Sequence, residues 1–152
     1  MYKCITFSIP NQFDNFFHKI IKDTNLNNKL VLFEDFDIIK DELSQITTLQ
    51  NDCHYNVKEI LKEINNKYYI LFIKALFSYN ENSNLSIKVS SLDDFLNSQY
   101  TTIIFITDST IVNIITKDNM VFEQIKNNAL NFSFRNIDIK ENGLPYNIFD
   151  YK

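Results

Sequence analysis

Alternating apolar and polar residues predict several β-strands in this chain. In residues 2–9, Ile5, Phe7 and Ile9 fall on one face and smaller or polar residues on the other, which is typical of a half-buried strand. The strongest signal is YYILFIKALFSY at 68–79, where every odd-numbered residue is apolar, so we expect a central strand. Similar patterns predict further strands at 29–39, 85–89, 101–108, 110–117 and 132–139. The pair at 101–108 and 110–117 is separated so tightly that it predicts a hairpin.

A helix is predicted directly after the first strand. Pro10 ends the strand, and Asn11 is of a type that caps helices. Apolar residues then recur at helical spacing on one face, at Phe13, Phe16, Phe17, Ile20 and Ile21. Asp14 would fall in the first turn, where the helix dipole favours an anion. His18 lies off the apolar stripe, so we expect it to be solvated.

Three more helices follow from similar signals. Residues 55–65 carry apolar side chains at helical spacing, and the segment Ser91-Leu92-Asp93-Asp94 fits a capping box before a short helix. A helix beginning near Asn119 would place Val121, Phe122, Ile125 and Ala129 together on one face. In the last strand the alternation slips at Arg135–Asn136, which indicates a β-bulge.

The order of these elements predicts the fold class. Hairpins mixed with helices favour an α+β protein, with an antiparallel or mixed sheet and about four helices packed on it. No composition break marks a linker, so residues 1–152 are interpreted as one globular domain, with 140–152 as a loosely packed tail.

Composition and charge argue against several functional classes. The chain holds 21 Asn and 22 Ile but only one glycine, Gly143, a bias that indicates an AT-rich genome. Phosphate-binding loops need glycines, so no nucleotide-binding fingerprint is present. The net charge is −4 and Arg135 is the single arginine, which argues against nucleic-acid binding. No stretch reaches 18 uninterrupted apolar residues, which argues against a membrane span.

The few histidines and cysteines point to no catalytic or metal site. Cys53 and His54 are adjacent, which lacks the usual ligand spacing, and a zinc site would have to recruit both cysteines and both histidines. Cys4 lies on a predicted strand and is interpreted as a small core residue. We therefore assign no catalytic residue, no metal and no cofactor. Two cysteines make no disulfide framework, and the N-terminus lacks a signal-peptide pattern, so the prediction is a cytoplasmic protein with reduced thiols.

An acidic segment is the candidate binding surface. The stretch FEDFDIIKDE at 33–42 contains five carboxylates: Glu34, Asp35, Asp37, Asp41 and Glu42. Acid–base catalysis would require two of them in a shared desolvated cleft, which the sequence does not indicate. Such an acidic rim can simply keep a protein soluble, or it can attract a basic partner, and these five residues are the candidates to contact one.

Several segments together resemble a known family. They are ITFSIPN at 5–11, YYILFIKALFSY at 68–79, SLDDFLNS at 91–98 and IIFITDSTIVNIITKD at 103–118. They resemble a family of small uncharacterised proteins, a domain of unknown function, from low-G+C Gram-positive bacteria and their mobile elements. The resemblance covers about 1–140, less clearly 34–55, and implies a bacterial accessory protein without implying any activity.

Three hypotheses about function follow. The first is a non-enzymatic protein-binding module, immunity-like or inhibitory, that uses its acidic surface. The second is an unrecognised enzyme or small-ligand binder, with carboxylate, Tyr and Asn side chains in a cleft. The third is a homo-oligomeric structural or regulatory protein that uses an uncovered apolar face.

Overall fold

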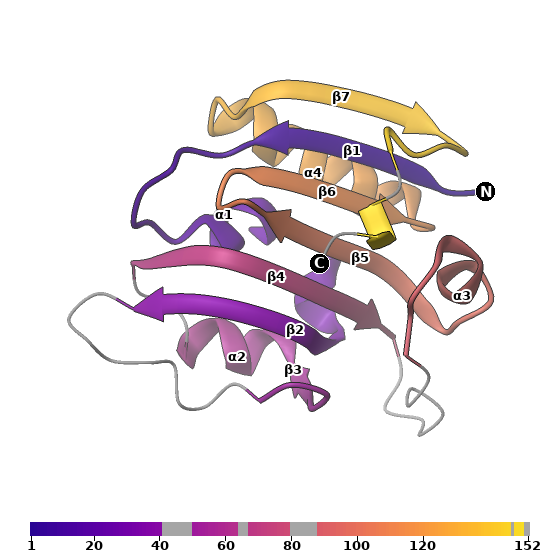
Figure 1. Ribbon diagram of the computed structural model, residues 1–152, viewed down its shortest axis with the longest axis horizontal. Helices are drawn as coiled ribbons and strands as arrows, with labels where there is room; N and C mark the ends of the chain where they lie inside the picture. The colour runs from indigo at the N-terminus through magenta and orange to yellow at the C-terminus, as the bar shows by residue number, and fades with distance from the viewer. Residues whose placement is uncertain (41–49, 64–66, 80–87, 147, 151–152) are drawn as a thin grey trace.

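The computed structural model describes residues 1–40, 50–63, 67–79, 88–146 and 148–150, which form one sheet with helices on both faces (Figure 1). Seven strands of these residues pair in the order β3-β2-β4-β5-β6-β1-β7. In chain order, the elements are β1 (Lys3–Ser8), α1 (Phe16–Ile21), η1 (Asn25–Asn28), β2 (Leu30–Lys40), β3 (His54–Asn56), α2 (Val57–Glu63), β4 (Tyr68–Ser78), α3 (Leu92–Leu96), β5 (Tyr100–Thr107), β6 (Ile111–Thr116), α4 (Asn119–Asn131), β7 (Arg135–Glu141) and η3 (Ile148–Asp150). Every neighbouring pair is antiparallel, which confirms the α+β class and decides for the antiparallel sheet.

The first strand lies between the last two. In β1, Ile5 pairs with Ile114 of β6 on one side and with Ile139 of β7 on the other. Because β6 and β7 both run antiparallel to β1, they are parallel to each other, and α4 is the crossover that connects them. The predicted hairpin is β5–β6, and its turn holds Asp108 and Ser109 at φ of 50° and 63°, the left-handed region that tight hairpin turns use.

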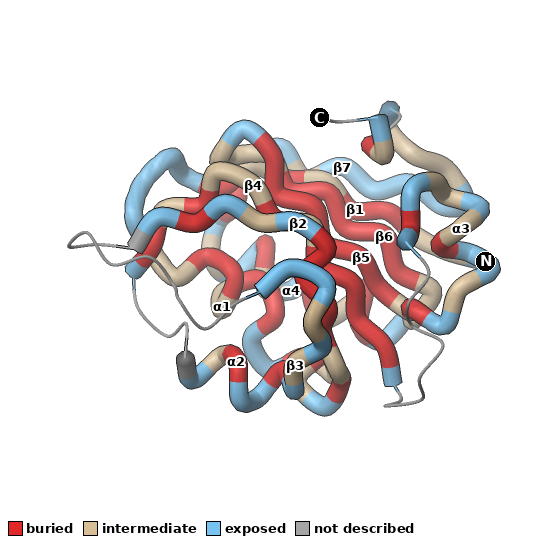
Figure 2. The backbone as a smooth tube through the Cα atoms, turned by 60° about the horizontal axis from the view of Figure 1, so that its bottom comes forward, coloured by how far each residue is buried: buried red, intermediate tan, exposed pale blue. Residues whose placement is uncertain are grey.

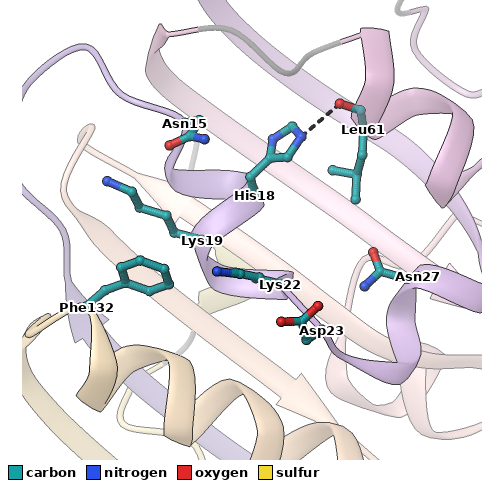
Figure 3. A pocket seen from close by; sticks show the side chains of 8 residues that line it. All are labelled: Asn15, His18, Lys19, Lys22, Asp23, Asn27, Leu61 and Phe132. Atoms are coloured by element: carbon teal, nitrogen blue, oxygen red, sulfur yellow. Dashed lines mark hydrogen bonds between the residues drawn. The ribbon is translucent and has the colours of Figure 1, made fainter.

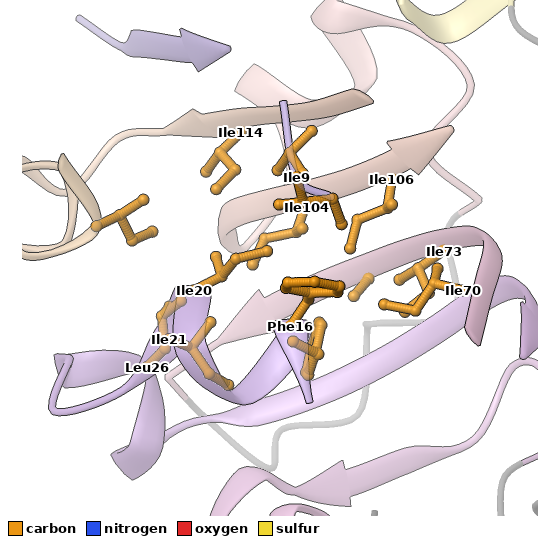
Figure 4. Packing of buried hydrophobic residues seen from close by; sticks show 14 of the residues in the cluster. Ile9, Phe16, Ile20, Ile21, Leu26, Ile70, Ile73, Ile104, Ile106 and Ile114 are labelled. Carbon is orange, nitrogen blue, oxygen red and sulfur yellow. The ribbon is translucent and has the colours of Figure 1, made fainter. Parts of the chain in front are cut away.

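Helices α1, α2 and α4 pack on one face of the sheet and bury the main core, which Figures 2 and 4 show. Phe17 is fully buried at its centre, with its ring centroid 5.8 Å from that of Phe33 and 6.3 Å from that of Phe77. The predicted apolar face of α4 is confirmed, because all four of its residues are buried: Val121, Phe122, Ile125 and Ala129. Fully burying a side chain such as phenylalanine contributes about 1.5–3 kcal/mol. This face buries more apolar side chains than the other, so it contributes more to stability.

Helix α1 begins later than the sequence predicts. Asp14 forms a β-bridge with Tyr68, in which the Asp14 amide donates to the Tyr68 carbonyl at 3.1 Å. This extended pairing keeps residue 14 outside the helix, so the predicted Asn11 cap and the placement of Asp14 in the first turn are wrong. The Asp14 carboxylate instead lies 2.6 Å from the Lys19 ammonium. Phe13 precedes the helix and is 43% exposed, so it is not part of the buried stripe.

A register shift in the β2–β4 pairing changes which face the β4 side chains take. The shift falls between Phe72 and Ile70, and as a result both Ile70 and Ile73 face the main core. The predicted apolar odd-numbered face is therefore correct only from Ile73 to Phe77. Tyr69 lies on the opposite face, because the irregularity reverses the alternation of side chains.

The second face of the sheet carries a smaller core. Helix α3 covers it with Phe95. Leu144, Ile148 and Phe149 also pack on it, and the ring of Phe149 meets that of Phe105 edge-on. Cys4 is buried in this cluster, as predicted. The half of this face towards the C-terminal end of β2 has no helix of the described residues over it (Figure 1).

Three local predictions fall near this face. The Ser91 cap of α3 is confirmed, since its hydroxyl accepts from the Asp94 amide at 3.1 Å. The predicted bulge in β7 is confirmed by the register shift opposite Thr6–Ser8 and by Asn136, whose φ is 57°. Of the strand predicted at 85–89, residues 85–87 lie outside the described residues, and Val89 is buried but not in a strand.

Candidate functional site

The acidic segment is divided by the fold. Asp35 and Asp37 are exposed on β2, whereas Glu34 is buried, so the prediction that Glu34 belongs to an acidic surface is wrong. Asp41 and Glu42 lie outside the described residues. Within the described residues, the predicted acidic binding surface therefore consists of two carboxylates.

Glu34 is buried because it forms an internal ion pair. It is the extra residue where the β2–β4 register shifts, between the pairs Phe33–Ala75 and Asp35–Lys74. Its Oε1 lies 2.8 Å from the Lys74 ammonium, and its Oε2 accepts from the Val89 amide at 3.3 Å. A buried charge is tolerated only when it is paired and hydrogen-bonded, and Glu34 meets both conditions.

Asp35 and Asp37 lie beside apolar side chains on the open half of the second sheet face. Ile39, which is 47% exposed, is paired with Tyr69 of β4, and the Tyr69 ring is 5.5 Å from the ring of Phe13. We call these five residues the β2–β4 surface. Strand β3 pairs only with Leu30 to Leu32 of β2. Beyond Leu32, no strand of the described residues pairs with the outer edge of β2.

A pocket of about 460 Å³ lies where α1 meets α2 and the C-terminal end of α4 (Figure 3). We call it the α1 pocket. It is lined by Asn15, His18, Lys19, Lys22, Asp23, Asn27, Leu61 and Phe132. Residues 15, 18, 19 and 22 follow a spacing of 3, 4 and 7, so they form the face of α1 opposite its buried stripe.

His18 is not solvated, contrary to the prediction. Its Nε2 donates to the Leu61 carbonyl at 2.8 Å, which joins α1 to α2 (Figure 3). Burial lowers the pKa of this imidazole, although the hydrogen bond to Leu61 opposes the shift. Nδ1 is buried without a hydrogen-bond partner among the described residues, which is the state expected of a neutral ring. The helical pattern missed this contact because it depends on the packing of α2.

A second polar cluster surrounds Lys29, whose side chain is 1% exposed. Its ammonium lies 3.4 Å from Asp118 Oδ2, 3.1 Å from Thr101 Oγ1 and 3.7 Å from the centre of the Tyr79 ring. The Tyr79 hydroxyl donates to Asp118, and burial together with this carboxylate raises the pKa of Tyr79 to about 12. Every charge in the cluster has a partner, which is typical of a structural role.

The cysteines and histidines remain scattered. Cys53 Sγ lies 3.6 Å from Gln50 Oε1, and His54 Nε2 lies 3.5 Å from the Tyr100 hydroxyl. Among the described residues, no group of three or more His, Cys, Asp or Glu side chains comes together as metal ligands would. No helix in the described part of the chain has the length and apolar character needed to cross a membrane.

The fold and these surfaces define a small antiparallel α+β protein with its main helices on one sheet face. Residues 2–145 match the family described as Protein of unknown function (DUF2691), and the chain belongs to this family. The chain is also similar to the Uncharacterized protein YncE of Bacillus subtilis (strain 168), with 24% identity over 142 residues, which cover 90% of each chain. These matches confirm the resemblance to a Gram-positive family and extend it through 34–55. No solved structure matches the chain.

Proposed function

We propose that this protein is a protein-binding module whose β2–β4 surface contacts a basic partner. The observation that supports the proposal most is the placement of exposed Asp35 and Asp37 beside Ile39 and Tyr69, on a part of the sheet that no helix of the described residues covers. Carboxylates steer a cationic partner by long-range attraction, and adjacent apolar side chains supply area that binding can bury.

The edge of β2 favours a partner that adds an extended segment. An edge strand presents unpaired backbone groups, and peptides bind such edges as an additional strand. At the other edge of the sheet, β7 carries Arg135 and Lys140 as well as acidic residues and is bent by the bulge at Asn136. Charged residues and bulges protect edges from pairing, so β2 is the edge better suited to a basic partner. An immunity-like or inhibitory protein would act in this way.

Site-specific photo-crosslinking in a native bacterial host tests the proposal. A photoreactive phenylalanine analogue replaces Ile39 in one variant and Leu130 in a control, because Leu130 is 59% exposed but lies on α4, against the other sheet face. We expect one basic protein to crosslink at position 39 and not at position 130. Crosslinks of equal yield at both positions, or crosslinks at position 39 to a second copy of this chain, would refute the proposal.

Charge reversal then tests the role of the carboxylates. The double variant Asp35→Lys, Asp37→Lys should bind the crosslinked partner about tenfold or more weakly, with a slower association rate and a weaker dependence on salt. The matched control reverses two exposed aspartates elsewhere, Asp93 and Asp138. If both double variants lost the same affinity for the partner, the loss would reflect only a general effect of net charge.

A further inference from the structure

The α1 pocket contains one cation and one anion that lack ion-pair partners among the described residues. Lys19 is satisfied by Asp14 at 2.6 Å, but neither Lys22 nor Asp23 forms an ion pair within the described chain. Both side chains are exposed and both line the pocket, where Figure 3 shows them on the turn that follows α1. A ligand that carried only a negative charge would meet Asp23, and one that carried only a positive charge would meet Lys22.

The turn that carries these two residues is held in place. Asn128 of α4 donates one hydrogen bond to the Ile20 carbonyl at 2.9 Å and another to the Lys22 carbonyl at 2.8 Å. From the other side, Asn27 donates to the carbonyls of Ile21 at 3.3 Å and Thr24 at 3.1 Å. The backbone on which Lys22 and Asp23 stand is therefore fixed before any ligand arrives, which lowers the entropy cost of binding.

Two of the eight residues that line the pocket are apolar. Phe132, the residue that follows α4, lies on one side with the Lys22 ammonium 5.9 Å from its ring centre, and Leu61 lies on the other (Figure 3). The hydrogen bond from His18 to the Leu61 carbonyl positions this second wall. The Asn15 side chain, which forms no cap of α1, adds a polar group at the rim. A volume of about 460 Å³ is in the range of small-molecule sites.

We propose that the α1 pocket binds a small zwitterion, a free α-amino acid with an apolar side chain. Its carboxylate would bind Lys22, its ammonium would bind Asp23, and its side chain would contact Leu61 and Phe132. Lys22 and Asp23 both line this pocket, so they are placed to face the two charged groups of one amino acid. This site lies away from the β2–β4 surface, and the proposal does not depend on the proposed function.

A titration followed by backbone-amide NMR tests the proposal with three probes of similar shape. L-leucine carries both charges, 4-methylpentanoate keeps only the carboxylate, and 3-methylbutylamine keeps only the ammonium. We expect L-leucine to shift the amides of Asn15, Lys22, Asp23 and Phe132, and each single-charge probe to bind about two- to fivefold more weakly, the range of one exposed ion pair. Equal binding of 4-methylpentanoate, no saturable shift with L-leucine, or shifts confined to other residues would overturn it.

Two variants test whether Lys22 and Asp23 bind the charged groups of L-leucine. Lys22→Met and Asp23→Asn should each weaken L-leucine binding by about two- to fivefold, and asparagine tolerates the left-handed backbone of residue 23, where φ is 54°. Lys140→Met, which removes an exposed lysine of β7, is the matched control and should bind as the parent protein does. The same spectra report whether each variant is folded. Unchanged affinity in both pocket variants would overturn the proposal.

Discussion

Replacing Asp118 with asparagine would remove the charge that faces the buried Lys29 and leave the cap of α4 in place. Asp118 Oδ1 accepts hydrogen bonds from the amides of Met120 at 2.9 Å and Val121 at 3.2 Å, and an asparagine carbonyl can accept both. Oδ2 is the atom that faces Lys29, at 3.4 Å. The substitution therefore separates the ion pair from the capping role.

The expected cost follows from the burial of the two groups. Removing one partner of a fully buried pair destabilises a protein by about 3–5 kcal/mol. The Asp118 side chain is 16% exposed, and Lys29 keeps the Tyr79 ring and the Thr101 hydroxyl as partners, so we expect about 2–3 kcal/mol for Asp118→Asn. Asp118→Ala also removes the cap and should cost about 1 kcal/mol more.

The effect should depend on pH. Burial alone would raise the pKa of Asp118, but the hydrogen bonds from Tyr79 and Val121 and the charge of Lys29 outweigh it, so the pKa is lowered. A carboxyl group whose pKa is lower in the folded state stabilises the protein above its unfolded pKa, and this contribution is lost as pH falls through the folded pKa. The difference in stability between the parent protein and Asp118→Asn should therefore be full at neutral pH and shrink in acid.

Urea denaturation measures the free energy of unfolding of four proteins: the parent, Asp118→Asn, Lys29→Met and the double variant. Each is measured at about pH 7 and about pH 3. We expect Lys29→Met to restore much of the stability lost in Asp118→Asn, because the unpaired buried ammonium is then gone. A coupling energy below about 0.5 kcal/mol, or a difference that does not shrink in acid, would refute the reasoning.

The remaining predictions concern the helix end, the core and the second ion pair. Ser133 follows α4 at φ 57°, and its amide donates to the Leu130 carbonyl at 3.1 Å, so Ser133→Gly should raise the free energy of unfolding by about 0.5–1 kcal/mol in urea titrations. Phe17→Ala, at a fully buried position, should lower it by about 3–5 kcal/mol; a loss under about 1 kcal/mol would contradict the assigned core. Glu34→Ala should cost about 2–4 kcal/mol, and adding Lys74→Met should recover part of that loss; a further loss instead would contradict the pairing.

Elements with an uninterrupted local pattern could be predicted from the sequence. The apolar face of α4, its start after Asp118 and the β5–β6 hairpin follow from residues close to one another in the chain. Helix α1 could not be placed correctly, because the β-bridge between Asp14 and Tyr68 joins residues far apart in sequence. Strand order was equally inaccessible, since insertion of β1 between β6 and β7 depends on long-range pairing.

The candidate sites show the same limit. The acidic segment was visible as composition, but no local pattern indicated that Glu34 would be buried in an ion pair with Lys74. The α1 pocket combines Lys22 and Asp23 with Leu61 from α2 and Phe132 from the end of α4. The one available signal was the polar face of α1, and a polar helix face is most often simply solvated.

The register shift at Glu34 explains how the acidic segment reaches the surface at all. Val31 and Phe33 face the main core, so strict alternation along β2 would turn Asp35 into that core as well and leave Phe36 outside. The extra residue reverses the alternation, and Phe36 packs against the core while Asp35 lies on the open face. The ion pair of Glu34 with Lys74 joins β2 to β4 at this irregularity. Glu34 is the extra residue of this irregularity, so its position in β2 sets the face on which Asp35, which is proposed to contact the partner, is exposed.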